Sequence, residues 1–288
     1  MGDKNSLIKL VECPRDAMQG WTRLIPTAQK IKYINAVLIV GFDTLDFGSF
    51  VSAKAIPQMA DTEAVLEGLD ISNSQTKLLA IVANNRGALK ACIYDQITYL
   101  GFPFSISPTF QYRNTNSSID ESFNRVKEIQ DLCAKNNKEL VIYISMGFGN
   151  IYGDVYNEDI VLKWLDEMVK IGIKTISVAD TVGVATPLQI TSLLNTIIPK
   201  YSNIEIGVHL HSTTISWKDK LEAALQAGCT RFDGALKGIG GCPMAGNDLV
   251  GNMDTELMIQ YFKNKQLLNN LNNNALLKCS KMANVIFE

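Results

Sequence analysis

The 288-residue chain lacks a strong excess of charge of either sign and lacks any long hydrophobic run. Its 27 basic and 29 acidic side chains give a net charge of −2, whereas nucleic-acid-binding proteins carry a basic patch or stripe. No apolar stretch approaches the roughly 20 residues that cross a bilayer, and the polar first ten residues are not typical of a secretory signal. We therefore expect a cytoplasmic protein with neither a nucleic-acid nor a membrane partner.

Paired cysteine motifs and a glycine-rich nucleotide loop are also missing. The six cysteines are scattered along the chain, and no two of them form a CxxC pair. A chain of this size buries enough apolar surface to fold without disulfides, so we expect reduced thiols. The first apolar run is followed by Cys-Pro-Arg-Asp rather than by GxGxxG, which argues against an open sheet that binds a dinucleotide.

The chain alternates between two kinds of segment. Short β-branched or apolar runs predict eight strands, at 8–12, 44–47, 77–82, 96–102, 140–145, 175–179, 204–209 and 231–234. Longer segments with helical spacing predict eight helices, at 27–40, 61–69, 86–94, 119–136, 158–171, 187–200, 217–227 and 254–263. Eight βα units predict an α/β fold, a (β/α)8 TIM barrel, which typically takes about 250 residues. We expect a single barrel domain at 1–265 and a short C-terminal extension at 266–288.

Residues at the expected ends of the helices support this interpretation. Ser118 precedes an acidic first turn, and Thr186 precedes a proline, as residues that cap the start of a helix do. Gly41, Gly172 and Gly228 each follow a helical run and precede a strand, which is typical of a glycine that ends a helix.

Polar residues collect after the predicted strands, where barrel enzymes place their chemistry. They are Arg15 and Asp16 after the first strand, Asp46 at the end of the second, Asp180 after the sixth, His209 and His211 at the seventh, and the loop from Gly238 to Pro243 after the eighth. Because these strand ends meet at one face of a closed barrel, this face is the expected site.

The two histidines of the chain are separated by one residue. In an extended segment, positions i and i+2 project to the same face, so His209 and His211 can offer both imidazoles to one ion. The alternative is a pair of hydrogen-bonded histidines at a loop. Asp16 could add a carboxylate, unless it serves only as a cap or turn residue. Two imidazoles and a carboxylate suit a divalent cation, with Mg²⁺ or Mn²⁺ favoured as oxygen ligands increase.

Three other residues can each be interpreted either as a catalytic group or as a residue without a catalytic role. Arg15 offers a fixed cation to a developing oxyanion if it points inward, and is a surface charge if it does not. Cys242 lies in a glycine-rich loop, where it is either a proton donor or nucleophile exposed to substrate, or a small bystander. Asp180 is either a site residue or a turn residue.

Together these residues resemble the 3-hydroxy-3-methylglutaryl-CoA lyase family of barrel metallolyases. The likeness runs from about Ile8 to Thr255. It is carried by Glu12-Cys-Pro-Arg-Asp16-Ala-Met-Gln19, Ser49-Phe-Val-Ser52 with Pro57-Gln-Met59, Ser118-Ile-Asp-Glu-Ser-Phe123, Asp180-Thr-Val-Gly-Val-Ala-Thr-Pro187, His209-Leu-His211, Gly238-Ile-Gly-Gly-Cys-Pro243 and Gly251-Asn252.

The resemblance implies a retro-Claisen cleavage of 3-hydroxy-3-methylglutaryl-CoA to acetyl-CoA and acetoacetate. It implies Mg²⁺ or Mn²⁺ held by Asp16, His209, His211 and Asn252, in a pyruvate carboxyltransferase-like barrel. Arg15 would stabilise the thioester oxyanion, Cys242 would protonate the enolate, and Asp16 or His209 would be the base. Asp46 and Asp180 would complete the catalytic set, and Gln19 and Tyr152 would join Arg15 in binding the acyl-CoA substrate. We also expect a homo-oligomer, a dimer, with a role in leucine catabolism.

The chain departs from the family pattern at several places. Ser212-Thr-Thr-Ile follows the second histidine, where the family has Asp-Thr-Tyr-Gly, and Asp46 stands where the family has glutamate. The loop from Met146 to Tyr152 lacks the family's Gly-Cys-Pro-Tyr, and the segment from Cys242 to Asn252 is one residue longer than usual. Two alternatives follow: a synthase of the same superfamily that condenses acetyl-CoA with a 2-oxo acid, and a non-catalytic barrel that binds acyl-CoA.

Overall fold

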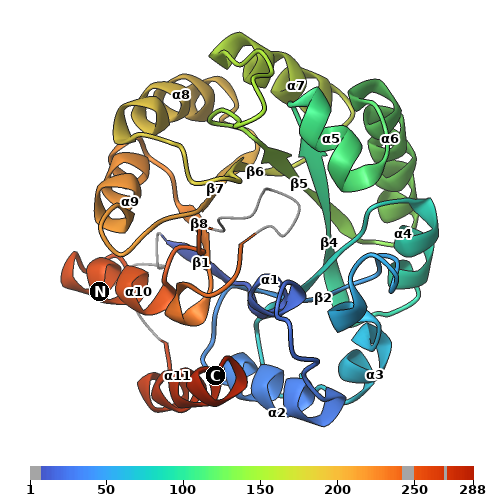
Figure 1. The fold of residues 1–288 in the computed structure, drawn as a ribbon, viewed down its shortest axis with the longest axis vertical. Helices are drawn as coiled ribbons and strands as arrows, with labels where there is room; N and C mark the ends of the chain where they lie inside the picture. The colour runs from blue at the N-terminus through green and yellow to red at the C-terminus, as the bar shows by residue number, and fades with distance from the viewer. Residues whose placement is uncertain (1–7, 242–249, 269–270) are drawn as a thin grey trace.

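The computed structural model describes residues 8–241, 250–268 and 271–288. Eight parallel strands close into a barrel in chain order, with β8 hydrogen-bonded to β1, and the helices form a ring outside it (Figure 1). The strands are β1 (Lys9–Glu12), β2 (Thr44–Ser49), β3 (Lys77–Ile81), β4 (Ile97–Ser105), β5 (Glu139–Ser145), β6 (Thr175–Asp180), β7 (Glu205–Leu210) and β8 (Arg231–Gly234). The predicted TIM barrel is confirmed, with all eight strands in their expected places.

All eight predicted helices are present, and their ends differ from the predictions by at most two residues. They are α2 (Thr27–Leu38), α3 (Thr62–Glu67), α4 (Asn85–Cys92), α6 (Ile119–Lys135), α7 (Glu158–Lys170), α8 (Pro187–Lys200), α9 (Trp217–Gln226) and α10 (Thr255–Asn264). The expected caps are confirmed, since Ser118 and Thr186 each form a capping box with the residue three positions later. Gly41, Gly172 and Gly228 have φ values of 87°, 86° and 91°, the left-handed backbone that favours glycine at a helix end.

Five short or peripheral elements were not predicted. They are α1 (Pro14–Gln19), α5 (Pro108–Thr115), α11 (Asn273–Ile286) and the 3₁₀ turns η1 (Pro57–Met59) and η2 (Leu236–Gly238). Three of them begin at a proline, which suits the first position of a helix but gives no helical periodicity of its own. Helix α1 has the largest consequence, because it carries Arg15 and Asp16 at the end of β1.

The C-terminal extension ends in α11, which lies beside α2 (Figure 1). The amide of Asn272 donates to the carbonyl of Val40 at 2.9 Å, and the ring of Phe287 meets the ring of Trp21 edge-on at 5.4 Å. From Asn273 onward the extension is therefore a helix packed on the barrel. The boundary between barrel and extension at residue 265 stays a prediction.

Apolar side chains fill two separate regions. The larger cluster lies between the strands and the surrounding helices, and the smaller one, built on Leu79, Ile81, Tyr99, Val141 and Tyr143, brings together side chains of β3, β4 and β5. No helix among the described residues is long and apolar enough to cross a bilayer.

Strand β2 continues beyond Asp46, so the expectation that Asp46 ends this strand was wrong. The strand runs to Ser49, and its register against β3 shifts between Asp46 and Gly48. A bulge of this kind redirects side chains locally, which explains why a strand without regular alternation was predicted too short.

Glu12, the last residue of β1, is a fully buried carboxyl group. Its Oε1 accepts from the amide of Leu236 at 2.9 Å, and its Oε2 accepts from Thr255 Oγ1 at 2.6 Å. Burial raises the pKa of Glu12 to about 8, although these hydrogen bonds act in the opposite direction. At neutral pH this side chain is therefore mostly protonated and joins β1 to the two segments that follow β8.

We expect Glu12→Gln to stabilise the protein progressively as the pH rises. Between about pH 4.5 and 8 the wild-type carboxyl is neutral when folded but ionised when unfolded. The stability that it contributes is complete below about pH 4.5 and is lost as the pH rises through about 8. The free energy of unfolding should thus shift in favour of the variant by up to about 1.4 kcal/mol per pH unit. Urea unfolding at several pH values measures this difference, and a constant difference would contradict a neutral Glu12.

Candidate active site

A cavity of about 630 Å³ opens at the carboxyl ends of the strands. Its polar lining includes Arg15, Asp16, Gln19, His209 and His211. The predicted face of the barrel therefore does bring together residues that are nearly 200 positions apart in the sequence.

The side chains of His209 and His211 face each other through their Nε2 atoms. Their Nε2 atoms are 3.3 Å apart. His211 Nδ1 donates to the carbonyl of Val250 at 2.7 Å, and His209 Nδ1 lies 3.2 Å from Asp233 Oδ2. Because both outer partners are acceptors, each neutral imidazole carries its proton on Nδ1 and turns an Nε2 lone pair inward. Two lone pairs at this distance repel each other unless a proton or a cation lies between them, so the arrangement fits a metal ion.

Asp16 lies beside the two histidines, and Asn252 hydrogen-bonds Asp16. Ligand atoms of Asp16, His209 and His211 are all within 4.8 Å of one another. Asn252 Nδ2 donates to Asp16 Oδ2 at 2.6 Å and to the carbonyl of Ile239 at 2.9 Å. Its buried Oδ1 has no hydrogen-bond partner among the described residues 8–241, 250–268 and 271–288. A buried amide oxygen without a partner is costly unless it binds something. The four expected ligands thus suit an oxygen-preferring divalent cation.

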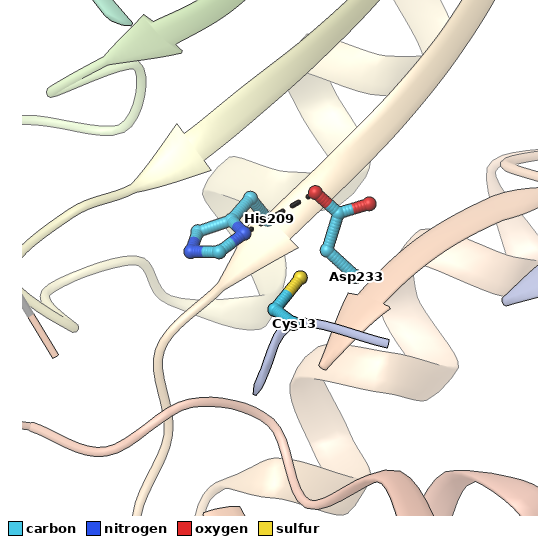
Figure 2. Close-up of side chains that lie close together, drawn as sticks. All are labelled: Cys13, His209 and Asp233. Atoms are coloured by element: carbon cyan, nitrogen blue, oxygen red, sulfur yellow. Dashed lines mark hydrogen bonds and ion pairs between the residues drawn. The ribbon is translucent and has the colours of Figure 1, made fainter. Parts of the chain in front are cut away.

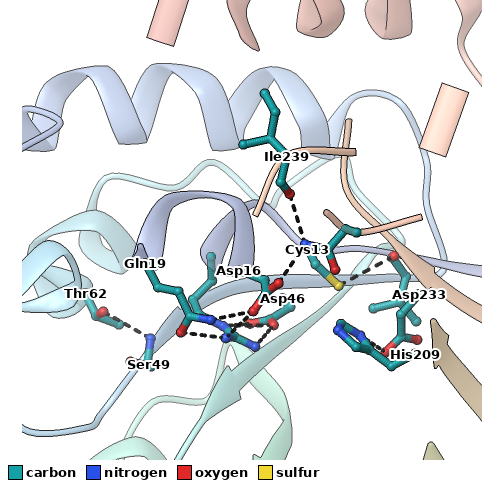
Figure 3. A network of polar contacts seen from close by, with 12 residues as sticks. Cys13, Asp16, Gln19, Asp46, Ser49, Thr62, His209, Asp233 and Ile239 are labelled. Atoms are coloured by element: carbon teal, nitrogen blue, oxygen red, sulfur yellow. Dashed lines mark hydrogen bonds and ion pairs between the residues drawn. The ribbon is translucent and has the colours of Figure 1, made fainter. Parts of the chain in front are cut away.

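Arg15 is held by two carboxylates, those of Asp16 and Asp46, which Figure 3 shows close together beside Gln19. Its Nε lies 3.0 Å from Asp46 Oδ2, and its Nη1 donates at 3.0 Å to both Asp16 Oδ1 and Gln19 Oε1. Gln19 Nε2 donates in turn to Asp16 Oδ1 at 2.6 Å. This network fixes the guanidinium at the cavity wall, so the inward orientation of Arg15 is the one observed.

Burial and the neighbouring charges set the ionisation of this network. Burial alone would raise the pKa of Asp16, but Arg15, both imidazoles and the Asn252 amide outweigh it and hold that pKa below its ordinary value. Burial raises the pKa of Asp46 to about 6 despite its pairing with Arg15. Asp16 is therefore an anion at neutral pH, as a metal ligand must be.

Two other predicted residues lie outside the cavity lining. Asp180 ends β6, where its Oδ1 accepts from the amide of Ala185 at 3.0 Å and its Oδ2 accepts from Lys220 Nζ at 2.6 Å. The ring of Tyr152 stacks on Phe110 with centroids 6.3 Å apart, and the guanidinium of Arg113 lies 4.7 Å from its centroid. Asp180 contacts Lys220, which also donates to the backbone of His211. Tyr152 contacts Phe110 and Arg113, which line the cavity. Cys242, the predicted proton donor, lies outside the described residues.

Two residues of the site were not predicted. Lys220 of α9 is 3% exposed, and its Nζ donates to the carbonyl of His211 at 2.9 Å as well as to Asp180. Asp233 of β8 is 2% exposed and orients His209. The sequence offered only weak signals for these two residues. Lys220 stands beside apolar residues in a helix, and Asp233 lies two positions after Arg231 in a buried strand.

Residues 8–283 match the model of the HMGL-like family. The chain belongs to the HMGL-like family. The hydroxymethylglutaryl-CoA lyase YngG of Bacillus subtilis is 31% identical over 271 residues, which are 93% of this chain and 89% of that protein. The structure of an HMG-CoA lyase from Acinetobacter baumannii, in complex with coenzyme A and 3-methylmalate, covers 100% of this chain and 93% of its own at 28% identity, with a TM-score of 0.92.

A more distant similarity concerns the fold alone. The carboxyl transferase domain of Rhizobium etli pyruvate carboxylase aligns with 97% of this HMGL-like chain and 47% of its own, at 16% identity with a TM-score of 0.71. The barrel is thus common to enzymes that share little of their sequence, and the function must be argued from the site.

Proposed function

We propose that this chain cleaves 3-hydroxy-3-methylglutaryl-CoA to acetyl-CoA and acetoacetate with a bound divalent cation. The observation that carries the proposal is the convergence of Asp16, His209 and His211 at a cavity that also presents Arg15. Beside them lies the side-chain oxygen of Asn252, which no described residue hydrogen-bonds. The similarity to hydroxymethylglutaryl-CoA lyases over most of the chain supports it and does not favour the synthase alternative.

The described site residues, together with the predicted proton donor Cys242, would supply each group that the cleavage needs. A divalent cation in this position would bind the tertiary hydroxyl of the substrate and lower its pKa. The hydroxyl proton passes to a base, with Asp16 and His209 as the candidates, and the C2–C3 bond breaks. Its electron pair forms the enolate of acetyl-CoA, and acetoacetate leaves with the new ketone. Arg15 stabilises the enolate oxygen, and the thiol of Cys242 gives C2 its proton.

The outer part of the cavity suits the coenzyme. Its lining includes Arg113 of α5 and Arg125 of α6, together with apolar side chains such as Val51, Ile81 and Phe110. Arginine is the residue best suited to pair with phosphate groups, while the apolar wall suits the pantetheine arm. Tyr152 would then support binding through its stacking against Arg113 rather than by direct contact.

The proposal also covers the metal ion, the oligomeric state, the location of the protein and its metabolic role. Mg²⁺ or Mn²⁺ is the proposed cation, because two of the four proposed ligands are oxygen donors. We also propose a homodimer, a location in the cytoplasm and a role in leucine catabolism.

We expect acetoacetate and acetyl-CoA in equal amounts when the protein is incubated with 3-hydroxy-3-methylglutaryl-CoA. Chelation should abolish both products, and added Mg²⁺ or Mn²⁺ should restore them, because the site needs a cation to activate the hydroxyl. Enzymatic acetoacetate detection checks this. Release of free CoA only from acetyl-CoA plus a 2-oxo acid would replace the lyase by the synthase, and binding of acyl-CoA without turnover would indicate the non-catalytic barrel.

A further inference from the structure

A second cluster of metal-ligand side chains, the lower site, lies at the Nδ1 side of His209, whereas the proposed catalytic site, the upper site, lies at its Nε2 side. Cys13 follows β1, His209 belongs to β7 and Asp233 to β8, three strands that are neighbours in the closed barrel. Candidate ligand atoms of the three residues are within 4.8 Å of one another. Figure 2 shows the sulfur of Cys13 and the carboxylate of Asp233 beside the Nδ1 edge of the His209 ring.

The cluster differs chemically from the site above it. A thiolate, an imidazole and a carboxylate are all ligands of Zn²⁺, and three protein ligands plus a solvent molecule complete a tetrahedron. The site of Asp16, Asn252 and two imidazoles contains no sulfur and favours a harder cation. A soft and a hard metal ion would therefore prefer different positions, on the two sides of the His209 ring.

A second observation points to a cation beside Cys13. Asp233 Oδ1 is buried and has no hydrogen-bond partner among the residues that the structure describes, so this carboxylate has an oxygen to offer to a cation.

We propose that Cys13, His209 and Asp233 form a Zn²⁺ site that inhibits the enzyme by taking His209 away from the catalytic cation. A neutral imidazole has one lone pair, and His209 now turns it toward His211 through Nε2. Zn²⁺ in the lower site binds Nδ1, so the ring proton moves to Nε2, while the thiol proton of Cys13 goes to solvent. His209 then faces the upper site with an N–H group and cannot act as a ligand there.

The first test is inhibition by Zn²⁺ at a fixed concentration of Mg²⁺. Cys13→Ser should retain Mg²⁺-supported turnover and need at least tenfold more Zn²⁺ for half-inhibition, because the soft ligand is lost. Cys229→Ser is the matched control, since both thiols are 1% exposed and donate to a backbone carbonyl, Cys13 to that of Val11 and Cys229 to that of Arg231. Among the described residues, Cys229 does not belong to a metal-ligand cluster. Its sensitivity to Zn²⁺ should equal that of the wild type. Equal sensitivity of Cys13→Ser would overturn the proposal.

The second test does not depend on activity. X-ray absorption of the Zn²⁺-loaded Cys242→Ser variant should show one sulfur at about 2.3 Å together with nitrogen or oxygen ligands. The additional change Cys13→Ala should remove that sulfur. A zinc shell without sulfur in the Cys242→Ser protein overturns the proposal, even if the Cys13 variants do not fold. Because this test reads binding alone, loss of the proposed lyase activity would leave its result intact.

Discussion

Replacing Asp16 by asparagine is expected to lower turnover at least about 10³-fold and to weaken Mn²⁺ binding severely. Changes to groups that merely support a metal ligand cost 10–100-fold, and Asp16 is the sole anionic member of the proposed set. Its carboxylate also accepts hydrogen bonds from Arg15, Gln19 and Asn252. Asparagine at this position therefore removes the charge of a metal ligand. It also leaves Arg15 with one of its two neighbouring carboxylates, that of Asp46.

The measurement is a Mn²⁺ titration followed by electron paramagnetic resonance, with steady-state turnover on the same samples. Asp61→Asn is the control, because the Asp61 carboxylate pairs with Lys30 at 2.6 Å and does not line the cavity. That variant should bind Mn²⁺ as the wild type does. If Asp16→Asn also bound Mn²⁺ with unchanged affinity, Asp16 would not be a ligand, and its effect on turnover would have to come through Arg15.

The fold was predictable because its signals are local. Each strand is a short apolar run and each long helix has its own periodicity, so the alternation can be read without knowing any long-range contact. Closure of the barrel then follows from the number of units. The histidine pair was also predictable, since positions i and i+2 of a strand share a face. The end of β2 was misplaced because the bulge at Asp46 interrupts that regular alternation.

The supporting residues of the site depend on contacts that no local pattern encodes. Lys220 meets Asp180 across 40 positions, and Asp233 meets His209 across 24, because neighbouring βα units of the barrel pack side by side. In the sequence, Lys220 is one polar residue in an amphipathic helix, and the usual interpretation of such a residue is an exposed charge. Cys13 was likewise one of six scattered thiols until the fold placed it beside His209.

Lys220→Met is expected to reduce both the stability of the protein and its affinity for the catalytic cation. All three N–H groups of Lys220 are used, since Nζ donates to Asp180 Oδ2 at 2.6 Å, to the carbonyl of His211 at 2.9 Å and to that of Gly183 at 3.0 Å. Methionine leaves Asp180 as an unpaired buried charge, which typically costs about 3–5 kcal/mol. It also leaves the His211 backbone without the contact that holds it at the end of β7.

A double variant separates these two effects. In Lys220→Met with Asp180→Leu neither buried charge remains, so most of the lost free energy of unfolding should return. The affinity for Mn²⁺ should stay at least about tenfold below that of the wild type, because the His211 carbonyl still lacks its donor. The exposed pair of Lys200 and Asp166 is the control, and Lys200→Met should cost less than about 1 kcal/mol with unchanged Mn²⁺ binding.

The outcome decides what the buried lysine does for the site. If Lys220→Met were destabilised but bound Mn²⁺ normally, Lys220 would act only in folding. His211 would then be positioned by its hydrogen bond to Val250 and its backbone pairing with Asn252. If metal affinity falls and the double variant recovers stability without recovering affinity, Lys220 positions a metal ligand through its backbone. In that case Asp180 acts on the metal site by fixing Lys220, which gives this strand-end aspartate a role without any contact to substrate or cation.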